Sequence, residues 1–167
     1  MLQHLTIRPF AEADWTDLWA ILRATFDAGD TYAFAPGSSE REIRAAWIDL
    51  PAATWVACAP DGALLGTYFI KPNQAGLGAH VCNCGYVVAP AFEGRGIASA
   101  LCEHSQRQAV AMGSHAMQFN LVVRTNERAV RLWQRLGYSV VGTLPGAFRH
   151  ARLGYVDALV MYKRLVE

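Results

Sequence analysis

The chain has few charged residues, and neither sign predominates. Only 17% of its 167 residues are Asp, Glu, Lys or Arg, and the formal net charge is +1. A charge excess this small argues against broad attraction to nucleic acid or membrane surfaces. No run approaches the roughly 18 to 20 apolar residues that span a membrane. The N-terminus, MLQHLTIRPF, lacks the basic-then-apolar order of a signal peptide. We therefore expect a cytoplasmic protein that binds neither nucleic acid nor membrane.

Cysteine is also scarce, and the four cysteines are not spaced like metal ligands. Cys82 and Cys84 are separated by one residue, whereas zinc sites use wider spacings. Cys58 and Cys102 lie in apolar surroundings and are typical of small core residues. We expect reduced, structural cysteines and no metal, with Cys82 or Cys84 as a candidate to line a substrate site.

Two common nucleotide-binding motifs are missing. No GxxxxGK[ST] string occurs, and the segment 94–99, GRGIAS, is one glycine short of GxGxxG. This segment nevertheless joins a β-rich stretch to an amphipathic helix. It is either an ordinary loop whose glycines ease the turn, or a site where exposed amides at the helix start bind phosphate or pyrophosphate. The second interpretation predicts a phosphorylated cofactor.

Length and a hydrophobic fraction of 53% predict one compact α/β domain over residues 1–167. Apolar periodicity and turn residues predict helices between Asp14 and Gly29 and over 39–50, 97–112 and 126–136. They predict strands over 2–8, 54–59, 64–71, 79–88, 116–123, 138–144 and 155–164, with longer loops at 27–39 and 145–154.

The glycine-punctuated segment resembles a motif of the GCN5-related N-acetyltransferases, V-x-x-P-x-x-[RQ]-x-x-G-x-[GA]. The matching residues are Val87, Pro90, Gly94, Gly96, Ile97 and Ala98. About thirty residues later, NERAVRLWQRLGY at 126–138 resembles the family's second signature, and 154–162 is similar to its last strand. The resemblance implies the α/β (α+β) fold of this family. That fold has a mixed sheet of about seven strands, splayed between strands 4 and 5 and flanked by about four helices.

The resemblance also implies acetyl-CoA as the acyl donor and suggests which residues bind it. The backbones of Val87 and Val88 would pair with the pantetheine arm, and the Val88 N–H would stabilise the oxyanion. Residues implied at the pyrophosphate are Gly94, Arg95, Gly96, Ile97, Ala98 and Ser99. Asn126 and Trp133 would lie against the cofactor, although Asn126 is also a natural helix N-cap and Trp133 a natural core residue.

Two positions depart from the family pattern. Glu93 stands where Arg or Gln is usual, so a carboxylate lies beside the expected pyrophosphate site. It would have to face solvent or pair with Arg95. Trp133 stands where many members have a Tyr that protonates the departing thiolate, and an indole N–H is no practical acid. One helical face carries four arginines: Arg124, Arg128, Arg131 and Arg135. One of them could bind the ribose 3′-phosphate of coenzyme A, or the face is solvated and Glu127 pairs with Arg131 at the i,i+4 spacing.

The catalytic base is not evident from the sequence. Candidates are His80, His150 and Asp157, each of which has a structural alternative in a turn or loop. The remaining interpretation is that proximity and an ordered water suffice.

The acceptor is expected at the wall formed by residues 27–39. Asp27, Asp30, Tyr32 and Phe34 would attract a cationic amine, while Arg149, His150 and Arg152 would make the opposite wall basic. The favoured function is acetylation of the primary amine of a small molecule, such as an amino acid or a related zwitterion. Alternatives are a protein or peptide N-terminal acetyltransferase and a non-catalytic acyl-CoA sensor. The apolar C-terminal strand is a candidate homodimer interface.

Overall fold

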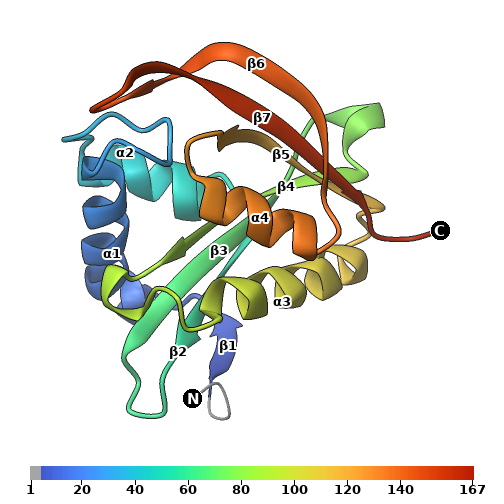
Figure 1. The fold of residues 1–167 in the computed structure, drawn as a ribbon. Helices are drawn as coiled ribbons and strands as arrows, with labels where there is room; N and C mark the ends of the chain where they lie inside the picture. Colours follow the sequence, from blue (N-terminus) through green and yellow to red (C-terminus); the bar gives the residue numbers. More distant parts are fainter. Residues whose placement is uncertain (1–4) are drawn as a thin grey trace.

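The computed structural model describes residues 5–167 as a single mixed β-sheet with helices on both faces (Figure 1). Its strands are β1 (Thr6–Pro9), β2 (Ala53–Cys58), β3 (Leu64–Pro72), β4 (Val81–Val88), β5 (Ala116–Val123), β6 (Ser139–His150) and β7 (Gly154–Arg164). The seven strands lie in the order β1-β2-β3-β4-β5-β7-β6. Neighbours run antiparallel except β4 and β5, which are parallel.

The helices divide between the two faces of the sheet. Helices α1 (Trp15–Asp27) and α2 (Glu40–Arg44) cover one face, and α2 continues into a π-helical turn, Ala45–Asp49. Helices α3 (Ile97–Ala111) and α4 (Glu127–Arg135) lie on the other (Figure 1). No helix within residues 5–167 is long and apolar enough to cross a membrane.

The element order expected from the sequence is confirmed, with differences at three places. The helix expected over 39–50 is α-helical only to Arg44, because its second half widens into the π-helical turn. Strand β6 continues to His150, so most of the loop expected at 145–154 is instead a long hairpin with a register shift between Leu144 and Phe148. Residues 2–4 of the first expected strand lie outside the described residues.

Strands β4 and β5 separate soon after they begin. They pair only at Val81 with Ala116 and at Cys82 with Met117. Beyond that point a side chain bridges them, because the Asn83 amide donates to Gln118 O at 2.9 Å. The sheet is therefore splayed between these two strands, which confirms the fold expected from the sequence.

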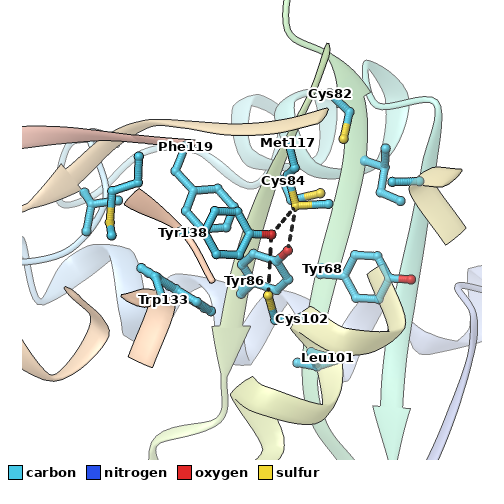
Figure 2. Close-up of a cluster of buried hydrophobic side chains, with 14 of the residues drawn as sticks. Tyr68, Cys82, Cys84, Tyr86, Leu101, Cys102, Met117, Phe119, Trp133 and Tyr138 are labelled. Atoms are coloured by element: carbon cyan, nitrogen blue, oxygen red, sulfur yellow. Dashed lines mark hydrogen bonds between the residues drawn. The ribbon is translucent and has the colours of Figure 1, made fainter. Parts of the chain in front are cut away.

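An aromatic and sulfur-rich core lies beneath the splay, on the α3 and α4 side (Figure 2). Phe119 stacks on Tyr138 with 4.3 Å between ring centroids, and Trp133 lies 5.1 Å from Tyr86. The Tyr138 hydroxyl donates to the Met117 sulfur at 2.8 Å. All four cysteines are buried and unpaired, as expected, and burial raises the pKa of Cys84, which keeps it a neutral thiol.

Candidate functional site

A cavity of about 820 Å³ follows the gap between β4 and β5. This volume is within the usual range for small-molecule and cofactor sites. Its walls come from the segment between α1 and α2 and the π-helical turn, from the end of β3, from β4 and β5, and from the start of α3 and the length of α4. Four charged side chains border it: Lys71, Glu93, Arg128 and Arg135.

One end of the cavity is built from the loop between β4 and α3. Gly94 and Gly96 have φ values of +76° and +82°, which non-glycine residues rarely adopt. Gly96 caps α3, so the N–H groups of Ile97, Ala98 and Ser99 have no partner within the helix. These three residues and both glycines border the cavity, whereas Arg95 packs over Phe92 with 5.2 Å to the ring centroid. Unpaired amides at the start of a 15-residue helix can hold a phosphate or pyrophosphate.

Glu93 pairs with Arg128 of α4, not with Arg95 as one expectation had it. The Arg128 Nη1 and Glu93 Oε2 atoms are 3.4 Å apart, and both side chains are exposed. A Cβ at position 94 would lie 3.1 Å from the Arg128 guanidinium, so the missing side chain of Gly94 leaves room for this arginine. Arg128 and Arg135 border the cavity, while Arg124 pairs with Asp157 and Arg131 pairs with Glu127.

The edge of β4 that faces the gap offers backbone groups at every second residue. The Ala89 N–H donates to Leu65 O on β3 at 2.9 Å, and Val87 lies opposite Thr67 in the same ladder. The backbone N–H and C=O groups of successive residues point to opposite edges of a strand. Those of Val87 therefore face β3, and those of Val88 face the gap. An extended ligand can therefore pair with the backbone of Val88.

Two residues of α4 that the sequence singled out border the cavity. Asn126 Oδ1 accepts the Ala129 N–H at 3.3 Å, so this side chain caps the helix as well as facing the cavity. Trp133 is buried against Phe119 and Tyr86, and its ring also forms part of the wall.

The other end of the cavity carries polar side chains that were not identified from the sequence. Lys71 on β3 and Asn83 on β4 are directly opposite in the sheet, so their side chains share one face. Asn120 on β5 also borders the cavity, and its amide donates to Asn73 at 2.7 Å. Thr31 Oγ1 is buried without a hydrogen-bond partner among the described residues. Only the pairing of β3, β4 and β5 brings these side chains together, which explains why no sequence motif marks them.

None of the three candidate bases borders this cavity. His80 is exposed and lies beside His115, with 5.8 Å between ring centroids. His150 is buried in the turn of the β6–β7 hairpin, where Nδ1 accepts the N–H groups of Arg152 and Leu153. Asp157 pairs with Arg124 and accepts the Gly146 N–H. All three have structural partners away from the gap.

The expected acceptor wall is present in part. Tyr32 and Phe34 border the cavity, but Asp27 and Asp30 do not. Asp27 accepts the Gly37 N–H at 2.8 Å and braces its own loop. Arg149 and Arg152 do not border the cavity either. The basic residue at the end of the cavity near Tyr32 and Phe34 is Lys71.

Residues 15–138 match the model of the Acetyltransferase (GNAT) family. The chain belongs to this family. A GCN5-related N-acetyltransferase from Kribbella flavida is 40% identical, with a TM-score of 0.92 over 98% of this chain and 99% of that one. The splayed sheet and the loop before α3 are thus features of a family fold.

Two further relatives show how far the similarity extends. The N-acetyltransferase aca1 of Schizosaccharomyces pombe is 38% identical over 99 residues, which are 59% of this chain and 47% of that protein. The chain thus matches about half the length of this curated relative. A phosphinothricin acetyltransferase from Sinorhizobium meliloti, solved in complex with acetyl-CoA, shares the fold at 20% identity. Its TM-score is 0.84 over 99% of this chain and 90% of that one. Acetyl-CoA is the acyl donor of the family.

Proposed function

We propose that this protein transfers the acetyl group of acetyl-CoA to the primary amine of a small molecule that also carries a carboxylate. Acetyl-CoA would lie along the gap, with its pyrophosphate at the start of α3 and its pantetheine arm beside Val88. The acceptor would enter from the end of the cavity that holds Lys71 and Asn83.

The position of Lys71 on the cavity wall is the main support for this proposal. Lys71 is half-buried, it borders the cavity, and its ammonium lies over the Phe69 ring with 5.4 Å to the centroid. Among residues 5–167, no carboxylate lies within ion-pair distance of it. A partly buried ammonium in a substrate cavity favours an anionic group on the substrate, and Asn83 beside it offers an amide.

A small acceptor fits the cavity better than a peptide. The tip of the β6–β7 hairpin reaches the segment between α1 and α2, where the Ala151 N–H donates to Gly29 O at 2.9 Å. This bond holds the hairpin tip beside the segment that carries Tyr32 and Phe34 of the cavity wall, although none of the hairpin residues 139–164 borders the cavity itself. Among the described residues that border the cavity there is no His or Asp, and the one carboxylate, that of Glu93, lies beside the start of α3 and is paired with Arg128. The acceptor amine therefore loses its proton to water, and the enzyme supplies proximity.

The test compares Lys71→Met and Lys71→Arg with the native protein, using pairs of acceptors. Each pair is an amino acid that supports thiol release and the carboxamide of the same amino acid. A charge-assisted hydrogen bond contributes roughly 1.5–3 kcal/mol, so Lys71→Met should lower kcat/KM for the acid about 10- to 100-fold. The carboxamide should be affected little, and Lys71→Arg should retain part of the preference.

Arg149→Met is the matched control, because Arg149 is exposed and lies outside the cavity wall. It should leave both acceptors unchanged. Equal losses for acid and carboxamide would refute the carboxylate contact. Acetylation of peptide N-termini, with no turnover of any small amine, would refute the small-molecule acceptor.

A further inference from the structure

A tyrosine hydroxyl occupies the edge of β4 in the middle of the gap. The Tyr86 N–H donates to Tyr32 Oη at 2.7 Å, and the same hydroxyl donates to Tyr86 O at 2.7 Å. One phenol therefore satisfies both backbone groups that β5 would pair with in a continuous sheet. Tyr32 belongs to the segment between α1 and α2 and is 54 residues away in sequence.

The ring of Tyr32 packs among three other aromatic side chains. Its centroid lies 5.2 Å from that of Phe26 and 5.7 Å from that of Trp47, both edge-on, and Phe34 lies 6.4 Å away. Burial raises the pKa of Tyr32 far above its ordinary value, so the phenol stays protonated and acts as a hydrogen-bond donor, not as a base.

We propose that the Tyr32 hydroxyl, in place of the Val88 N–H implied by the family resemblance, is the donor that holds the thioester oxygen of acetyl-CoA. This inference rests on the proposed position of the cofactor arm beside Val88. Tyr86 lies two residues before Val88, about 7 Å along the strand and away from the loop between β4 and α3, here called the phosphate loop (residues 89–96). The thioester therefore reaches the gap beside Tyr86. At that point Tyr32 Oη accepts the Tyr86 N–H, and the Tyr32 O–H donates to the thioester oxygen.

The O–H needs only to turn about the phenol C–O bond, from Tyr86 O toward the thioester oxygen. The Tyr86 N–H continues to donate to Tyr32 Oη and makes the phenol a stronger donor. As the amine nitrogen bonds to the thioester carbon, the carbonyl electron pair moves to the oxygen, which accepts the Tyr32 hydrogen bond. When the pair returns, the C–S bond breaks and the thiolate leaves, and the amine proton goes to water.

Tyr32→Phe tests this role without requiring a known acceptor. The variant keeps the ring packing and removes only the hydroxyl. The readout is the infrared C=O stretch of acetyl-CoA labelled with ¹³C at the thioester carbonyl, bound to each protein. A hydrogen bond to the oxygen weakens the C=O bond, so the native protein should shift the band to lower frequency than Tyr32→Phe does. Tyr155→Phe, at a 76% exposed position, is the matched control and should resemble the native protein.

Turnover provides the second readout. Loss of one oxyanion donor should lower kcat about 100-fold for any amine that is acetylated, with little change in the dissociation constant of acetyl-CoA. Tighter binding of acetyl-CoA by Tyr32→Phe, with kcat unchanged, would show that the hydroxyl only blocks the strand and would overturn the proposal. An unshifted band in the bound native protein would overturn it too. Failure of the native protein to bind acetyl-CoA would instead refute the proposed cofactor site.

Discussion

Glu93 places a carboxylate beside the unpaired amides of α3, where family members usually have Arg or Gln. In this chain the carboxylate is paired with Arg128, so one positive charge that faces the cavity is partly neutralised. The ion pair is exposed, and salt weakens such pairs. Glu93 is therefore compatible with phosphate binding, but it lowers the positive potential at that end of the cavity.

Glu93→Gln should tighten the binding of acetyl-CoA. The substitution removes the carboxylate and frees Arg128 for a phosphate oxygen. Because an exposed pair is worth up to about 1 kcal/mol, we expect the dissociation constant to fall by no more than about fivefold, and less at high salt. Calorimetric titration at two salt concentrations measures this.

Glu127→Gln is the control for that experiment. This substitution also removes one negative charge, at the residue next to Arg128 in α4. The ion-pair partner of Glu127 is Arg131, which does not border the cavity. The affinity of Glu127→Gln for acetyl-CoA should match that of the native protein. A weaker complex with Glu93→Gln would mean that the Glu93–Arg128 pair positions the phosphate loop.

At the scale of the element, helix α4 presents Arg128 and Trp133 to the cavity, and Asn126 fixes where it begins. The sequence left two roles open for Asn126, helix cap and ligand contact. Different substitutions of Asn126 distinguish between these roles. Serine also caps helices but lacks the reach of the amide.

Asn126→Ala should lower the free energy of unfolding by about 1 kcal/mol, because the Ala129 N–H loses its partner. Asn126→Ser should restore most of that stability, as measured by urea denaturation. If the amide also contacts the pantetheine arm, Asn126→Ser should still bind acetyl-CoA more weakly than the native protein does. Native affinity in the stable Asn126→Ser variant would assign Asn126 to capping alone.

The glycine-containing loop between β4 and α3 and helix α4 could be predicted from the sequence because their signals are local. The glycines at 94 and 96, the helix that follows them, and the Asn cap all lie within short segments. The extension of β6 past Pro145 could not be predicted in this way. It depends on pairing with β7, such as that of Phe148 with Val156, and on a register shift that accommodates the Pro-Gly segment.

At the scale of the whole molecule, the end of the cavity that holds Lys71 and Asn83 exists only once the sheet is assembled. Lys71 and Asn83 become neighbours through the β3–β4 register, and Tyr32 meets Tyr86 across 54 residues. The positive φ of Gly29 has a similar origin. Gly29 follows the end of α1, as expected. Its missing side chain also lets the tip of the β6–β7 hairpin approach, because a Cβ at position 29 would lie 2.9 Å from the Cβ of Ala151. Sequence periodicity contains no record of such contacts. The candidate bases, which were chosen for their positions near strand ends, do not border the cavity.

The central claim is that acetyl-CoA binds in the gap between β4 and β5. The most direct test is a titration of ¹⁵N-labelled protein with acetyl-CoA, following the backbone amide signals. We predict saturable shifts, largest at Val88 and at the amides of residues 94–99, with little change in the β6–β7 hairpin beyond its tip. Saturable shifts confined to other surfaces, or none at all, would contradict the account.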